Sequence, residues 1–174
     1  MAAQAQIASM ILHLLRDYRD LVYDRKVHEL DAVDWHLLEE LQRDARLSFN
    51  ELSRRVNLSA PAVAERVRRL QEAGVITGYH AHIDLTKAGR QATALIRMHC
   101  YGPTCLLREP AVAQWPEILQ MHRVSGDACC ALKVSVTSMA ELEQFIDKLA
   151  GYGRPSTAMI LSSPITWRAV EPLT

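Results

Sequence analysis

Residues 48–74 read SFNELSRRVNLSAPAVAERVRRLQEAG, and this stretch decides the fold of the first half of the chain. Ser48 is followed three residues later by Glu51. This is the pattern of a capping box, in which each side chain satisfies a free backbone amide at the start of a helix. The pattern predicts a short helix that begins after Ser48 and ends at about Val56.

A second helix follows after a tight turn over residues 57–59. Ser59 is a good N-cap for a helix over 60–73, and Pro61 is tolerated in its first turn because the amides there lack helical partners. Gly74 suits the left-handed conformation that ends many helices. The stretch therefore predicts a helix-turn-helix.

The two helices are expected to be apolar inside and basic outside. Apolar residues recur at gaps of three and four, which places them on one buried face: Leu52, Val56, Val63, Val67 and Leu70. Between positions 54 and 69 there are five arginines and one acidic residue, in a chain whose formal net charge is 0. Arginine clamps phosphates and reads guanine edges, so this surface is typical of DNA binding. The alternative is a solvated helix pair in an adaptor module.

The expected DNA contacts come from both helices and the turn. Small residues at the start of the second helix allow its free amides to approach a phosphate, and we expect this helix to enter the major groove. Three of its arginines would then be divided between base edges and phosphates. The candidate residues are Ser48, Asn50, Arg54, Ser59, Ala62, Glu65, Arg66, Arg68 and Arg69.

The segments around this pair have weaker signals. A helix is expected over 32–45, and residues 75–85 are expected to form a short hairpin or an extended wing. The polar, glycine-containing segment 86–90 is the best domain boundary. Residues 1–29 carry an apolar stripe at helical spacing. This stripe predicts an amphipathic helix that packs on its own fold or on a second subunit, with membrane-surface binding as the minor alternative.

The second half of the chain predicts an α+β domain. Strands are expected over 91–100, 118–124, 128–136 and 157–162, with helices over 105–114 and 138–149. This order is that of a ferredoxin-like split βαβ fold. In the first strand, alternation places Leu95 opposite a buried set: Ala92, Ala94, Ile96 and Met98. Helices would cover one face of the sheet, and a second subunit is the simplest cover for the other.

Composition excludes several classes of protein. The chain has 174 residues, of which 49% are hydrophobic and 23% charged, as in ordinary globular domains. No apolar stretch is long enough to span a membrane, and the N-terminus lacks the basic start of a secretory signal, so we expect a cytoplasmic protein. We find no phosphate-cradling glycine loop and no nucleophile elbow, so we expect no enzymatic activity.

Four cysteines, Cys100, Cys105, Cys129 and Cys130, raise the question of a metal or redox site. None shows the two-residue spacing of structural zinc sites. We therefore expect reduced, buried or half-buried thiols and no metal or cofactor. A regulatory thiol at Cys129 is a further hypothesis.

Several motifs together resemble the Lrp/AsnC (feast/famine) transcriptional regulators of bacteria and archaea. The resemblance runs from about residue 30 to the C-terminus. One small departure is Pro61, which stands one residue later than the proline that often follows the cap serine in that family. The matching segments are LDAVD at 30–34, LQRDARLS at 41–48, ELS at 51–53, LSAPAV at 58–63, RVRRL at 66–70 and GVITGY at 74–79.

The resemblance implies a regulator that binds double-stranded DNA and senses a small amino acid in its second domain. It also implies a homodimer that assembles further, with an octamer as one form. The family's effector turn has a glycine, an acid, an aromatic residue and an aspartate, but Ala128 and Cys129 replace the last two here. The implied effector-binding residues are Gly126, Asp127, Ala128, Cys129, Ser156 and Thr157. Without the resemblance, the spacing of Gly126 and Asp127 favours an ordinary hairpin turn over a ligand pocket.

The expected domain organisation follows from these elements. It comprises an N-terminal extension over 1–29, a helix-turn-helix domain over 30–85, a linker over 86–90, and an effector-binding and oligomerisation domain over 91–174. The rival interpretation is a small-molecule-binding or enzymatic α+β module whose helical half contacts protein.

Overall fold

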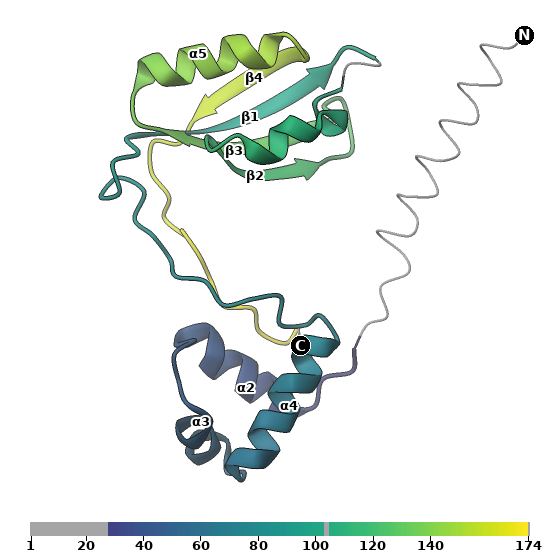
Figure 1. Ribbon diagram of the computed structural model, residues 1–174, viewed down its shortest axis with the longest axis vertical. Coiled ribbons are helices and arrows are strands. Elements are labelled where there is room, and N and C mark those ends of the chain that lie inside the picture. Colours follow the sequence, from purple (N-terminus) through teal and green to yellow (C-terminus); the bar gives the residue numbers. More distant parts are fainter. Residues whose placement is uncertain (1–27, 103–104, 174) are drawn as a thin grey trace, which may run out of the picture. The chain divides into compact units, whose positions relative to one another are not determined.

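The structure, a computed structural model, describes residues 28–102 and 105–173 (Figure 1). These residues form two compact units, one made of 28–80 with 169–173 and the other of 81–168. The expected N-terminal amphipathic extension lies outside the described residues, apart from its last two positions.

Three helices form the first unit: α2 (Ala32–Arg43), α3 (Phe49–Val56) and α4 (Ala60–Glu72). The predicted capping box is present, since Ser48 Oγ accepts from the Glu51 amide at 3.3 Å and Glu51 Oε2 accepts from the Ser48 amide at 2.8 Å. Ser59 Oγ likewise accepts from the Ala62 amide at 3.4 Å. Asn57 takes a left-handed conformation, with φ 52°, in the turn between α3 and α4. The predicted helix-turn-helix is confirmed.

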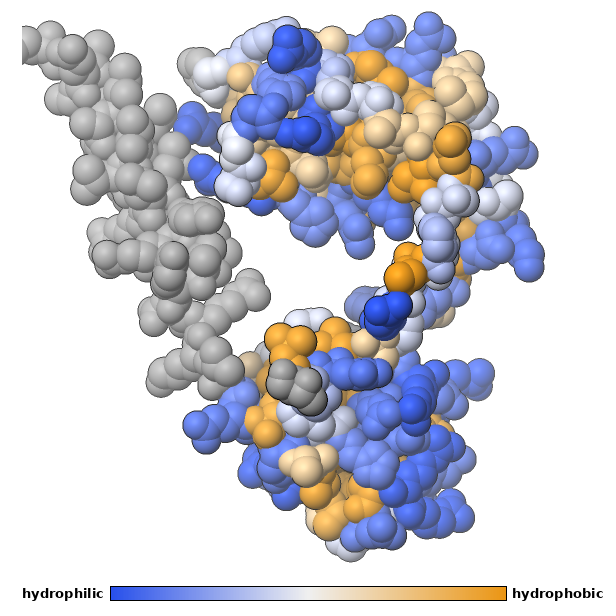
Figure 2. Space-filling model, turned by 180° about the vertical axis from the view of Figure 1, so that it is seen from behind, coloured by the Kyte–Doolittle hydropathy of each residue, from blue (hydrophilic) through white to orange (hydrophobic). Residues whose placement is uncertain are grey.

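The core of the first unit consists of the predicted inward-facing residues. Each of them is 8% exposed or less: Leu52, Val56, Val63, Val67 and Leu70. All but Leu70 form one cluster with Leu37 and Leu41 of α2. The outer surface is left to polar side chains, and Figure 2 shows hydrophilic residues over much of the visible face of this unit.

The chain beyond α4 corrects one expectation. Residues 75–85 contain no strand, so the expected hairpin is not formed and the segment runs extended (Figure 1). Gly74, with φ +70°, ends α4 as predicted. The C-terminal segment 169–173 is tied to α2, because the Val170 amide donates to Gln42 Oε1 at 2.8 Å and the Val170 carbonyl accepts from Gln42 Nε2 at 3.1 Å.

The second unit is a four-stranded antiparallel sheet in the order β2-β3-β1-β4. Its strands are β1 (Ala92–Cys100), β2 (Ile118–Arg123), β3 (Cys130–Val136) and β4 (Gly153–Met159). Helix α5 (Met139–Ala150) and the short 3-10 helices η1 (Leu106–Arg108) and η2 (Pro110–Gln114) complete it. This arrangement confirms the predicted α+β fold.

Two elements of this unit differ from their predictions. The expected helix over 105–114 is divided into η1 and η2 by Glu109, which is extended (φ −88°, ψ 105°). A residue before proline is sterically pushed out of the helical region, and Pro110 follows here. Strand β4 begins at Gly153, four residues earlier than expected, because Gly153 pairs with Cys100 of β1.

The two faces of the sheet follow the predicted alternation. The four inward residues of β1 are at most 4% exposed and pack with apolar residues of η1, η2 and α5: Ala92, Ala94, Ile96 and Met98. On the opposite face Leu95 is 50% exposed and lies between Lys133 of β3 and Ala158 of β4. We call this second face, which carries Leu95, the open face.

Candidate functional site

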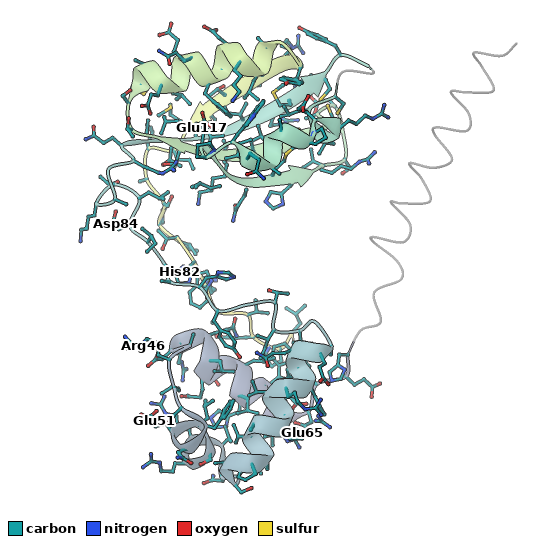
Figure 3. All side chains as sticks on the ribbon, in the orientation of Figure 1. Arg46, Glu51, Glu65, His82, Asp84 and Glu117 are labelled. Carbon is teal, nitrogen blue, oxygen red and sulfur yellow. The ribbon has the colours of Figure 1, made fainter. Side chains whose placement is uncertain are left out.

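The outer surface of α3 and α4 carries the residues predicted to contact DNA. Ser59 at the N-cap of α4 is exposed, and Ala62 in its first turn is half-buried. Glu65, one turn further along, is exposed on α4 (Figure 3). The start of α4 therefore presents small side chains, as expected of a helix that approaches a phosphate.

Arg66 forms ion pairs with two aspartates of its own unit. Its Nη1 donates to Asp31 Oδ2 at 2.7 Å and to Asp34 Oδ1 at 2.8 Å. The Asp34 side chain is only 4% exposed. Hydrogen bonds from the Asp34 amide and then from Arg66 lower the pKa of Asp31, and the two carboxylates raise the pKa of Arg66. Arg66 thus joins α4 to the start of α2, and a direct DNA contact by it stays a prediction.

Arg68 is held by carboxylates of its own helix. It donates from Nη2 to Glu65 Oε1 at 2.6 Å and from Nη1 to Glu72. All three side chains are more than half exposed. These hydrogen bonds raise the pKa of Arg68. Exposed ion pairs contribute little stability, so a phosphate can replace Glu65 or Glu72 as the partner of Arg68.

The remaining arginines divide into one paired and two available side chains. Arg55 pairs with Glu40, whose side chain is 9% exposed, and this hydrogen bond lowers the pKa of Glu40. Arg54 is exposed, donates from Nε to the backbone oxygen of Asn50 at 3.0 Å, and forms no ion pair with residues 28–102 or 105–173. Arg69 is exposed and forms no ion pair with any described residue. Arg54 and Arg69 are therefore the cations of this surface that are free to meet a ligand.

At the N-terminus of α3 the predicted contact residues are used locally. The Ser48 hydroxyl donates to Glu51 Oε2 at 2.6 Å, and hydrogen bonds from Ser48 lower the pKa of Glu51. The Asn50 carbonyl accepts from Arg54, and the residue is exposed. Asn50 therefore contacts Arg54 one turn further along α3, whereas Ser48 is occupied by the cap of the helix.

The predicted effector turn is anchored to β1 by its second residue. Gly126 has φ +104°, the positive value that the sequence predicted for a turn with open amides. The Asp127 carboxylate pairs with Arg97, and the Asp127 carbonyl lies 3.1 Å from His99 Nδ1. Ala128 is buried, at 3% exposed. Arg97 and His99 were missed from sequence, although alternation places both on the same face as Leu95.

Ser156 and Thr157 lie on opposite faces of the sheet. Ser156 pairs with Arg97 in the ladder and therefore shares the open face, whereas Thr157 pairs with Ile96 and points to the other face. The structure thus brings Asp127, Arg97 and Ser156 to one face, whereas Thr157 lies on the other.

A cavity of about 560 Å³ lies elsewhere in the second unit. Its polar lining includes Arg90, Glu117, Ser135, Glu141 and Lys148, and none of the six predicted effector residues. Glu117, labelled in Figure 3, has a buried Oε2 without a hydrogen-bond partner among the described residues. Of the predicted effector residues, Gly126 and Asp127 instead lie in an exposed turn before β3, and Ser156 and Thr157 lie on β4.

All four cysteines are free, three of them half-buried and one buried, as predicted. Within the described ranges, one group of three side chains with metal-ligating atoms comes together: Cys100, Cys105 and Cys129. The sequence spacing did not reveal this group. None of the helices in the described part of the chain has the length and apolar character needed to cross a bilayer.

Comparisons with known proteins agree with this architecture. Residues 30–71 match the AsnC-type helix-turn-helix domain, and residues 93–170 match the Lrp/AsnC ligand binding domain. An uncharacterized HTH-type transcriptional regulator of Bacillus subtilis, YezC, is 39% identical over 134 residues, which are 77% of this chain and 95% of that protein.

Two solved structures show the same fold along their whole length. The B. subtilis LrpC structure has a TM-score of 0.76 at 33% identity and covers 80% of this chain and 100% of its own. The feast or famine regulatory protein Rv3291c of M. tuberculosis, complexed with L-methionine, has a TM-score of 0.76 at 31% identity and covers 83% of this chain and 100% of its own. With both of its units matched, this chain belongs to the Lrp/AsnC family of helix-turn-helix transcriptional regulators.

Proposed function

We propose that this regulator binds specific double-stranded DNA by inserting the N-terminal half of α4 into the major groove. The observation that carries this proposal is the division of the five arginines on the helix pair. Two of them hold buried carboxylates, whereas Arg54 and Arg69 are exposed and form no ion pair with any residue that the structure describes. Arg68 would join them by exchanging Glu65 or Glu72 for a phosphate.

The DNA-binding set that we propose keeps the residues predicted from the sequence. Ser59 and Ala62 allow close approach of the helix, and Glu65 and Arg69 follow on the same side of α4. Arg66 would act through the position of α4. Ser48, Asn50 and Arg54 would contact the backbone beside the groove, as the first helix of such motifs does.

We propose a small amino acid as the effector, bound at the open face beside the turn at 126–128. Such a ligand carries an ammonium and a carboxylate. Asp127 suits the first and Arg97 the second, once the ligand separates their ion pair. Ser156 can hydrogen-bond either group. The L-methionine bound to the M. tuberculosis relative supports this class of ligand.

The assembly that we propose is a homodimer, with further association up to an octamer. Exposed Leu95 lies at the centre of the open face, and burying it against a second copy would remove apolar surface from water. Effector binding at this face would favour one placement of the DNA-binding pairs over another and so change DNA affinity.

We propose domain boundaries at 30–85, 86–90 and 91–174, with the first 29 residues as an extension of unassigned role. We also propose a regulator without enzymatic activity that acts in the cytoplasm. The two matched domains, one for DNA and one for a ligand, support this assignment.

DNA binding is tested by fluorescence anisotropy with the duplex upstream of the protein's own coding region and a scrambled duplex of equal length. We expect tighter binding to the first, with log affinity falling by about 0.9 per phosphate contact for each decade of salt. Equal affinity for both duplexes would contradict a sequence-specific regulator.

Effector binding is tested by a thermal-shift screen of the twenty amino acids. We expect at least one to raise the melting temperature. The response should be lost in Arg97→Met but kept in Thr157→Ala, because Thr157 points to the other face. If no amino acid stabilises the wild-type chain, the effector proposal is wrong, whereas the DNA experiment stands independently.

A further inference from the structure

Three cysteines meet at one end of the sheet in the second unit. Cys100 is the last residue of β1, Cys105 immediately precedes η1, and Cys129 immediately precedes β3. Their three Sγ atoms lie within 4.8 Å of one another. The chain approaches this point from three different elements, so the grouping is a product of the tertiary fold.

Backbone hydrogen bonds hold the three thiols in place. The Cys129 amide donates to the Met98 carbonyl at 2.8 Å, which attaches the start of β3 to β1. The Cys105 carbonyl accepts from the Arg108 amide at 2.8 Å and closes the turn of η1. The cluster is therefore preorganised, and little ordering is needed to bring its sulfurs together.

The sulfur atoms already interact with one another and with a backbone donor. Cys105 Sγ donates to Cys100 Sγ at 3.1 Å, and the Cys100 amide donates to Cys129 Sγ at 2.9 Å. Cys129 Sγ also donates to the Met98 carbonyl at 3.2 Å while it carries its proton. An amide hydrogen bond to a cysteine sulfur is an outer interaction that stabilises a metal-bound thiolate.

The surroundings shift the pKa values of two of these thiols in opposite directions. Burial by itself would raise the pKa of Cys129, but hydrogen bonds from the Cys100 thiol and amide and from the Cys105 thiol outweigh it, so the pKa is lowered. Burial raises the pKa of Cys100, and the two neighbouring thiols add to this rise.

The spacing suits a small thiophilic ion. Zinc binds thiolate sulfur at about 2.3 Å, which separates the sulfurs of a tetrahedral site by roughly 3.8 Å. Sulfurs that all lie within 4.8 Å reach this separation by small side-chain rotations. Three sulfur ligands without an oxygen ligand favour soft or borderline metals over magnesium and calcium.

We propose that Cys100, Cys105 and Cys129 form a three-thiolate site for one thiophilic divalent cation, Zn²⁺ or Cd²⁺, with a fourth position left to solvent. The site lies beside the proposed effector turn and includes Cys129, but cation binding is measured without DNA or an amino acid. Because Cys129 directly follows the turn at 126–128, a bound cation ties this turn to the end of β1 and to η1.

The test is a Cd²⁺ titration of the full chain, kept reduced with a phosphine, and followed by the ultraviolet thiolate-to-metal charge-transfer band. We expect saturation at one ion per chain. Changing an outer hydrogen-bond partner of a metal ligand costs about 10–100-fold in affinity, so losing a ligand in Cys100→Ser, Cys105→Ser or Cys129→Ser should cost at least about tenfold. The matched control Cys130→Ala should keep the affinity, because Cys130 is not one of the three grouped thiols.

A second measurement on the wild-type chain does not depend on variants that fold. Zn²⁺ should protect three thiols from a colorimetric thiol reagent, while the buried Cys130 reacts only after unfolding. Circular dichroism confirms that each variant is folded. The absence of a charge-transfer band, an unchanged thiol reaction with Zn²⁺, or loss of binding in folded Cys130→Ala would each overturn the three-thiolate assignment.

Discussion

Arg66 and Arg69 lie three positions apart on α4, but the structure gives them different roles. Arg66 donates to Asp34 at 2.8 Å, and the Asp34 side chain is 4% exposed. Arg69 is exposed without an ion pair among the described residues. We predict that Arg66→Met destabilises the first unit, whereas Arg69→Met leaves stability unchanged and weakens DNA binding.

The size of the Arg66 effect follows from the surroundings of Asp34. Removing one partner of a fully buried ion pair costs about 3–5 kcal/mol. The Arg66 side chain is 26% exposed, so water reaches part of the pair. The Asp31 amide also donates to Asp34 Oδ2 at 3.4 Å and continues to do so in the variant. We therefore expect about 2 kcal/mol, the cost of losing one hydrogen bond to a charged group.

The assay is a double-mutant cycle of Arg66→Met and Asp34→Asn, with urea unfolding followed by circular dichroism. Residues in direct contact should show a coupling energy of about 1–2 kcal/mol. Arg69→Met is the matched control, and its free energy of unfolding should stay within about 0.5 kcal/mol of wild type. A coupling below about 0.5 kcal/mol, or the same profile for both arginine variants in the stability and DNA assays, would refute the reasoning.

Three other predictions follow from the contacts of individual residues. Arg54→Met and Arg69→Met should each reduce the slope of log DNA affinity against log salt by about 1, as measured by anisotropy, and an unchanged slope would remove that arginine from the phosphate contacts. Gly153→Ala should lower the free energy of urea unfolding by about 1–3 kcal/mol, because the added Cβ would lie 2.4 Å from the His99 carbonyl oxygen. Gly151→Ala is the control, because a Cβ there would lie 3.5 Å from the Lys148 carbonyl oxygen, an ordinary contact distance. Arg55 lowers the pKa of Glu40 below its ordinary value of 4.5, so the stability from this pair is fully present above that pH and is lost as pH falls through the lowered value. Arg55→Met should therefore flatten the decline of the melting temperature in acid. An unaltered decline would show that the pair contributes nothing to stability.

Local features of the fold were predictable because they depend on neighbours a few positions away. The Ser48 and Glu51 cap, the inward apolar residues of α3 and α4, and the alternation along β1 need only helical or strand geometry. Because these rules use only neighbouring residues, the predictions failed where segments distant in sequence meet. The last strand was expected over 157–162, whereas Gly153 already pairs with Cys100, and its absent side chain is what allows β1 and β4 to approach.

The candidate sites were only partly predictable for a related reason. The pattern of arginines indicates a basic surface, but it does not say which guanidinium finds a carboxylate. Arg66 meets Asp34 from 32 positions away, and Arg55 meets Glu40 from 15 positions away. These pairings leave Arg54 and Arg69 as the available cations.

The amino-acid order alone determined the helix-turn-helix, the α+β second half and the resemblance to one family, since periodicity and caps are properties of short segments. The partners of the arginines, the division of Ser156 from Thr157, and the meeting of three thiols were decided by tertiary structure. Cys100 and Cys129 are 29 positions apart, yet the antiparallel pairing of β1 with β3 places their sulfurs together. The register between two strands depends on burying a whole face of the sheet, so a short segment of sequence does not show which residues will lie opposite one another.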